Sequence, residues 1–88
     1  MEITLYVQGE EIIQKSASLR EQKEFDEAIK LIEENIDLID PSIRMNAWFE
    51  AFKAAEESGN SALAKKYAQV AAQEYPDLPS IKKYLYGE

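Results

Sequence analysis

The sequence predicts an all-α domain made of antiparallel helical hairpins, four helices followed by a short capping helix. Apolar residues recur at the three- and four-residue steps of a helix face in three successive stretches, 25–39, 43–55 and 63–75. Residues that interrupt helices, Pro41 and Gly59, separate these stretches. Because the connections are only a few residues long, neighbouring helices must pack antiparallel.

The first helix is expected over residues 10–22, and the preceding apolar residues 3–7 are expected to extend it through Gly9. A single glycine inside a helix costs only about 1 kcal/mol, which permits this continuous helix. The alternative is a short extended arm, which the β-branched and aromatic residues of this segment favour. The expected apolar stripe of the helix comprises Ile12, Ile13, Ser16 and Leu19.

The second helix is expected from Phe25 to about Asp40. It ends there because a residue that precedes proline is disfavoured in the helical conformation. Asp40 is then suited to cap the next helix, with Pro41 in its first turn, where the missing N–H is not needed. The stripe of the second helix comprises Phe25, Ala28, Ile29, Ile32, Ile36 and Ile39.

The third and fourth helices are expected on either side of Gly59. This glycine is suited to the left-handed conformation that ends a helix, and Asn60 or Ser61 can cap the helix that follows. Residues 80–86 are expected to form the short capping helix, with Ile81, Tyr84 and Leu85 covering helix four. The expected buried stripe is Ile43, Met45, Trp48, Phe49, Phe52 and Ala55 on helix three and Leu63, Ala64, Tyr67, Ala68, Ala71, Ala72 and Tyr75 on helix four.

The second hairpin resembles a tetratricopeptide (TPR) repeat, with an aromatic residue early in its first helix, a tight turn, small residues at the helix crossing and a closing proline. The residues that carry the resemblance are Trp48, Gly59, Asn60, Ala64, Ala71 and Pro76, with Ser16, Leu19, Phe25, Ala28 and Ile32 at matching positions of the first hairpin. The step from Ala28 to Ala64 is 36 residues, against 34 in the standard unit. Since two repeats fall short of the usual three, the chain is expected either to dimerise or to pack more like a bundle.

The resemblance implies a groove lined by the first helix of each hairpin, in which another protein or a peptide binds. The groove residues that it implies are Ile13, Ala17, Arg20, Asn46, Phe49, Lys53 and Glu56. Phe49 is expected to be either a binding anchor or a packing contact to helix one. The carboxylate clamp found in some TPR proteins is not expected, since Ile13, Gln14 and Glu50 occupy its positions and only Asn46 and Lys53 fit.

Composition argues against several functions. Residues 1–40 carry eleven acidic and four basic side chains while residues 41–88 carry six of each, so the net charge of −7 belongs to the first part of the single domain 1–88. Nucleic acid would be repelled there, whereas a basic protein would be attracted. No apolar run approaches the ~20 residues of a membrane span, and the first residues do not resemble a signal peptide, so a cytoplasmic location is expected.

No residues suited to catalysis or to a cofactor stand out. The chain has no histidine and no cysteine, and its three glycines are isolated, so a general base, a thiolate ligand and a phosphate loop are missing. Glu33, Glu34, Asp37 and Asp40 are close in sequence, but a helix surface does not wrap a cation, so no metal site is expected. The prediction is a non-enzyme without a cofactor.

Three functions remain open from the sequence. The first is an adaptor that binds a protein or peptide in the groove. The second is a small acidic inhibitor or immunity-type protein that binds a basic target through its N-terminal acidic face. The third is a helical subunit whose exposed stripe forms a homodimer.

Overall fold

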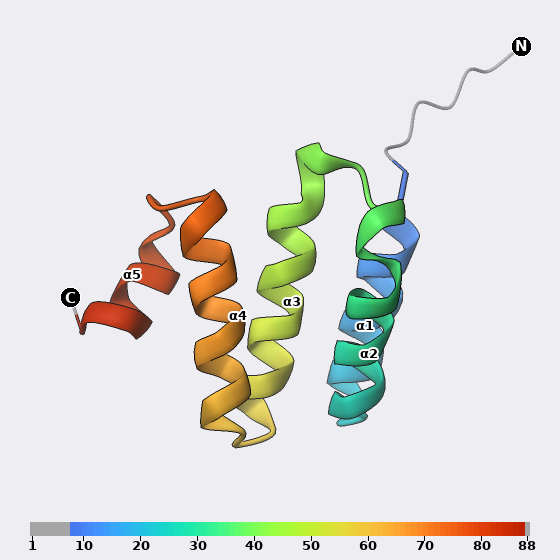
Figure 1. Cartoon of the computed structure of the whole chain (residues 1–88). Coiled ribbons are helices and arrows are strands. Elements are labelled where there is room, and N and C mark those ends of the chain that lie inside the picture. The colour runs from blue at the N-terminus through green and yellow to red at the C-terminus, as the bar shows by residue number, and fades with distance from the viewer. Residues whose placement is uncertain (1–7, 88) are drawn as a thin grey trace, which may run out of the picture.

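The computed structural model describes residues 8–87, which fold into helices joined by short turns (Figure 1). No strand occurs within that range, so the predicted all-α class of helical hairpins is confirmed. Besides two single 3₁₀ turns, η1 and η2, the described range contains five α-helices. In chain order the elements are α1 (Glu10–Glu21), α2 (Phe25–Asn35), η1 (Ile36–Leu38), η2 (Pro41–Ile43), α3 (Arg44–Glu57), α4 (Ser61–Glu74) and α5 (Pro79–Tyr86).

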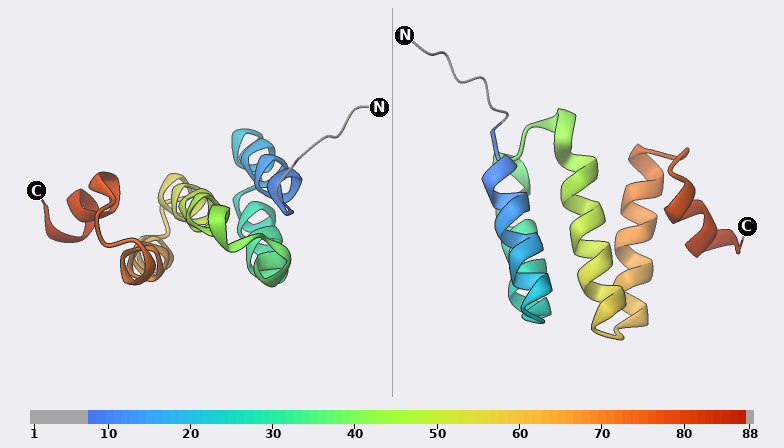
Figure 2. Two further views of the ribbon diagram at one scale, coloured as in Figure 1. Left: turned by 90° about the horizontal axis from the view of Figure 1, so that it is seen from above. Right: turned by 180° about the vertical axis from the view of Figure 1, so that it is seen from behind.

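The helices alternate between two layers. Seen along the helix axes, α1, α3 and α5 lie on one side of the molecule, and α2 and α4 lie on the other (Figure 2). Each hairpin therefore contributes one helix to each layer, and α5 follows α3 in the first layer. We call the surface formed by α1, α3 and α5 the front face.

Alanine dominates the core between α3 and α4. Small side chains let two helix backbones approach closely, and the larger Phe52 and Tyr67 fill the remaining space. The expected buried stripe was wrong in part, because several of its members are only half-buried: Ile43, Met45, Trp48 and Phe49 on helix three and Leu63, Ala72 and Tyr75 on helix four. The fully buried alanines of these two helices are Ala47, Ala51, Ala54, Ala55, Ala64, Ala68 and Ala71.

The first helix does not pass through Gly9, which corrects the expectation of a continuous helix there. Gly9 adopts a left-handed conformation with φ of 94° and precedes α1 as its N-cap residue. A side chain at this position would meet the Cα atom of Ile39 at 2.6 Å. Close approach of residue 39 to the start of α1 therefore requires glycine. The remainder of this prediction, on residues 3–7, lies outside the described residues.

The second helix is also shorter than expected. It ends at Asn35 and tightens into the 3₁₀ turn 36–38, after which Ile39 is extended. The backbone N–H of Asp40 donates to the carbonyl of Gln8 at 2.8 Å, so the chain crosses the start of α1 instead of continuing the helix. Ile39 is buried by this crossing and not as part of a helix. The apolar spacing that predicted a longer helix therefore included a residue that lies beyond the end of α2.

Two predicted caps are confirmed, although the helix expected to start at Pro41 begins with the 3₁₀ turn η2 and becomes α-helical only at Arg44. The Asp40 carboxylate accepts the N–H of Ser42, and Pro41 begins η2, which leads directly into α3. Gly59 has φ of 81°, and the side chain of Asn60 caps α4 by accepting the N–H of Leu63. The capping helix begins one residue earlier than expected, at Pro79, and buries Ile81 against the core.

Candidate protein-binding groove

Three hollows on the front face meet at Phe49. One lies between α1 and α3 and has a volume of about 470 Å³; two lie between α3 and the region of α5 and measure about 220 and 510 Å³. The α1–α3 hollow is lined by Glu10, Ile13, Gln14, Ile43, Asn46, Phe49, Glu50 and Lys53. The smallest hollow, which is mostly apolar, is lined by Met45, Asn46, Phe49, Leu78, Pro79 and Ile81. The third is lined by Phe49, Phe52, Lys53, Glu56, Glu57, Lys83 and Tyr84.

Phe49 is half-buried and held by its neighbours on α3. Its ring stacks on that of Phe52, with centroids 6.0 Å apart and planes inclined by 13°. Phe52 in turn meets Tyr84 of α5 edge-on at 4.9 Å, which ties the front face to the capping helix. The Lys53 ammonium lies 4.9 Å from the centroid of the Phe49 ring. Phe49 is thus a fixed aromatic ridge between hollows on either side of α3.

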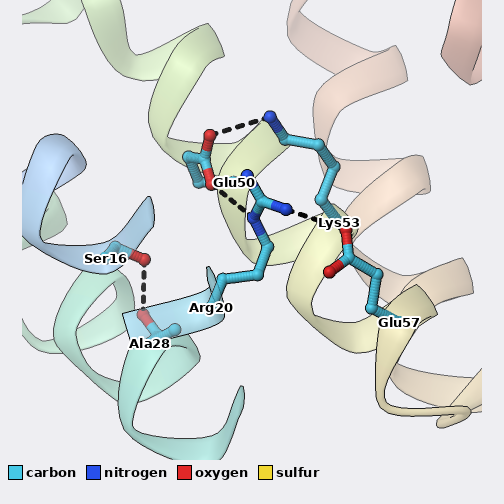
Figure 3. A network of polar contacts seen from close by, with 6 residues as sticks. All are labelled: Ser16, Arg20, Ala28, Glu50, Lys53 and Glu57. Carbon is cyan, nitrogen blue, oxygen red and sulfur yellow. Dashed lines mark hydrogen bonds and ion pairs between the residues drawn. The ribbon is translucent and has the colours of Figure 1, made fainter. Parts of the chain in front are cut away.

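A network of ion pairs joins α1 to α3 beneath the front face (Figure 3). Glu50 is almost fully buried, and each of its oxygens accepts from a different cation: Oε2 from Nε of Arg20 at 3.0 Å and Oε1 from Nζ of Lys53 at 2.8 Å. Arg20 also donates to Glu57 at 2.8 Å. Two cations and two carboxylates balance one another, so the network carries no net charge.

The network keeps its arginine charged despite partial burial. Burial lowers the pKa of Arg20, but the hydrogen bond and the charge of Glu50, together with those of Glu57, outweigh it and raise the pKa above its ordinary value. The side chains of Arg20 and Glu50 are 17% and 11% exposed, so water screens this pair only weakly. The pair is therefore a fixed part of the site.

The structure brings most of the predicted groove residues together. The α1–α3 hollow is lined by Ile13, Asn46, Phe49 and Lys53. Glu56 lines the hollow of about 510 Å³ between α3 and α5, together with Phe49 and Lys53. Arg20 lies beside them but is committed to Glu50 and Glu57. Ala17 is half-buried and lines none of these three hollows.

Glu50 is central to the network, although from the sequence it was expected only to occupy a position of the carboxylate clamp and was not among the predicted groove residues. Its positions relative to two neighbours carried a signal: Glu50 shares a helix face with the buried residues Ala47 and Ala54, and Lys53 follows at the i+3 position suited to an ion pair. A charged residue among alanines at these spacings predicts a carboxylate that is buried and paired. Its second partner, Arg20, is 30 residues away and was not readable from local spacing.

The opposite layer uses part of the acidic cluster for structure. Glu33 of α2 accepts the hydroxyl proton of Tyr67 and also pairs with Lys66 at 3.4 Å, which links α2 to α4. Burial and this hydrogen bond raise the pKa of Tyr67 above its ordinary value. Glu34 and Asp37 stay exposed, next to Leu38, whose surface is 54% exposed. Glu33 is therefore more than a solvated side chain.

Within residues 8–87, no group of three or more potential metal ligands gathers in space. In the same range, no helix has the length and apolar character needed to cross a lipid bilayer.

Comparisons with protein-family profiles, with curated proteins and with solved structures give no match for this chain.

Proposed function

We propose that this protein is a TPR-like adaptor module that binds a peptide segment of another protein across its front face. The observation that carries the proposal is the position of Phe49, a half-buried aromatic residue shared by all three hollows of that face. Aromatic residues, phenylalanine included, are enriched in the buried centre of protein interfaces. The alternation of helices between two layers supports the resemblance to TPR repeats, because it leaves the first helix of each hairpin on one continuous surface.

The test begins with selection of peptide ligands. Random dodecapeptides displayed on phage would be selected on the immobilised protein, and affinities of the recovered peptides measured by fluorescence polarisation. Phe49→Ala is expected to weaken binding by about tenfold or more, which is the effect of losing a hot spot of about 1.4–2 kcal/mol. Its melting temperature is expected to fall by only a few degrees, since the ring is half-buried.

Two control variants separate this face from the acidic one. Leu38→Ala removes an exposed apolar side chain on η1, and Glu34→Lys combined with Asp37→Lys reverses the acidic charge next to it. Glu33 is left intact because it holds Tyr67. Both control variants are expected to bind the peptides as the wild type does. If they abolish binding and Phe49→Ala does not, the front face is not the binding surface.

The second candidate function is an acidic inhibitor that blocks a basic protein. The exposed carboxylates Glu34 and Asp37, close in sequence to the exposed Leu38, favour it, because protein interfaces combine apolar contacts with a polar rim. Salt distinguishes the two functions. Affinity through the acidic face should fall steeply between low and physiological ionic strength, whereas affinity anchored by Phe49 should change little.

A further inference from the structure

We infer that Lys53 occupies, in the free protein, the place that a lysine or arginine side chain of the bound peptide takes. The inference rests on the proposed function and specifies the partner: a peptide with one basic residue near one apolar residue. On binding, the basic group of the peptide would displace the Lys53 ammonium from Glu50 and from the Phe49 ring.

The contacts of Lys53 describe a cation site made of two groups. Its Nζ atom lies 2.8 Å from Oε1 of Glu50 and 4.9 Å from the centroid of Phe49. A buried carboxylate combined with an aromatic face binds any compact cation, because the carboxylate supplies charge and the ring supplies its negative π-surface. Both groups are fixed: Glu50 by Arg20 and Phe49 by stacking on Phe52.

Lys53 is the member of this site that can leave. Its side chain is 30% exposed, against 11% for Glu50. It lines both the α1–α3 hollow and the hollow of about 510 Å³ between α3 and α5. A lysine that swings into water regains its full hydration, which offsets part of the lost ion pair, while Glu50 has no such freedom. When Lys53 leaves, Arg20 faces both Glu50 and Glu57, so the site has a net charge of −1. An incoming cation restores neutrality.

The apolar part of the peptide has a place next to this site. The small apolar hollow of about 220 Å³ shares Asn46 and Phe49 with the α1–α3 hollow, so the two lie on either side of the Phe49 ridge. Met45, Leu78 and Ile81 supply the apolar lining. A peptide that crosses α3 can therefore place an apolar side chain in one hollow and a basic side chain in the other.

The test uses fluorescein-labelled octapeptides of glycine and serine that contain one leucine and one lysine, separated by one to four residues. In matched peptides norleucine replaces the lysine, which keeps the chain length and removes the charge. Fluorescence polarisation would give the affinity of each peptide for the wild type and for Lys53→Ala. We expect Lys53→Ala to bind the lysine peptide about 5–10-fold tighter than the norleucine peptide. We also expect the lysine peptide to bind Lys53→Ala about 5–10-fold tighter than the wild type. Lys82→Ala, which removes an exposed lysine of α5, should bind as the wild type does.

The inference is overturned if the norleucine and lysine peptides bind Lys53→Ala equally, or if Lys53→Ala binds the lysine peptide more weakly than the wild type does. If both peptides bind and Phe49→Ala weakens them without any preference for lysine, only this inference fails. If neither octapeptide binds any variant while the phage-selected peptides bind the wild type, only this inference fails; if the selection also recovers no peptide that depends on Phe49, the proposed function fails as well.

A second measurement tests the cation site without a peptide. Lys53→Ala removes the atoms that n-propylammonium contains, so this ion is expected to raise the melting temperature of Lys53→Ala more than that of the wild type. 1-Propanol at equal concentration, with sodium chloride to match the ionic strength, should not have this effect. Equal shifts in both proteins, or equal shifts with propanol, would show that no cation site remains when Lys53 is removed.

Discussion

The joint between α3 and α4 is apolar, whereas the joint between α1 and α3 depends on charged side chains. The first is lined by buried alanines with Tyr67 stacked on Trp48 at 5.9 Å. The second depends on Arg20 and Glu50, a charged pair from helices that meet at the edge of a hollow. One helix, α3, takes part in both joints: it contributes buried alanines to the first and the Glu50 carboxylate to the second.

This contrast indicates which part of the molecule is suited to exchange partners. Close packing of alanines leaves no space for a ligand and penalises any change of volume. A charged network at a half-open surface is held by geometry and charge, and in our proposal a cation of the partner replaces Lys53 there. The α3–α4 joint therefore serves as the scaffold, and the α1–α3 joint is where we place recognition.

The largest expected effect breaks the polar joint. Glu50→Met leaves Arg20 and Lys53 without their shared carboxylate and is expected to cost about 2–4 kcal/mol, below the full range for buried pairs because some solvent reaches the network. In a domain of this size that corresponds to a fall of about 10 °C or more in the melting temperature. Differential scanning calorimetry would measure it, with Glu56→Met, an exposed carboxylate of the same helix, as the control.

The double variant Arg20→Met/Glu50→Met sharpens this result. Replacing both members of a buried pair by apolar side chains removes the penalty of an unpaired charge. The double variant is therefore expected to regain at least half of the stability lost by Glu50→Met. If it is less stable than the single variant, the network stabilises the α1–α3 joint by more than mutual neutralisation.

A smaller effect is expected from overfilling the apolar joint. Ala64→Leu inserts a larger side chain where α4 meets α3 and should destabilise by about 1–3 kcal/mol. Ala62→Leu, at an exposed position of the same helix, is the matched control and should be close to neutral. Urea unfolding of both variants would decide. Equal stability of the two would show that α4 does not pack closely on α3.

These two joints also show how far the sequence predicts the structure. The turns at Asp40 and Gly59 were predictable because capping and left-handed glycine are local chemistry. The conformation of Gly9 was not, because Ile39 imposes it from the far end of the first hairpin. Likewise the burial of Glu50 depends on Arg20 of another helix, so spacing along α3 indicated a pair without showing its second partner.

Alkaline pH should weaken the apolar joint through Tyr67. Burial and the Glu33 hydrogen bond raise the pKa of this phenol in the folded state, so its contribution to stability is complete below the ordinary value of 10.0 and is lost as the pH rises above it. Melting temperatures measured from about pH 9 to about pH 11 should fall more steeply for the wild type than for Tyr67→Phe. Tyr86→Phe, at a residue 68% exposed, should follow the wild type. Parallel curves for the wild type and Tyr67→Phe would contradict the assignment.

The smallest expected effect concerns Asp40, which lies where the chain passes from the first hairpin into η2 and α3. The Asp40 carboxylate accepts a hydrogen bond from the N–H of Ser42, and this bond lowers the pKa of Asp40 below the ordinary 3.8. Because the folded state prefers the ionised form, this stabilisation is complete above the ordinary pKa and is lost as the pH falls through the lower folded value. Asparagine caps a helix about as well as aspartate but does not titrate, so Asp40→Asn should match the wild type at neutral pH and lose less stability in acid. Urea unfolding of both proteins at pH 7 and at about pH 3 measures the stability that each loses in acid. The two proteins differ only at residue 40, so the difference between their losses belongs to this cap. An equal acid loss in both would mean that the Ser42 contact adds nothing to the link between the hairpins.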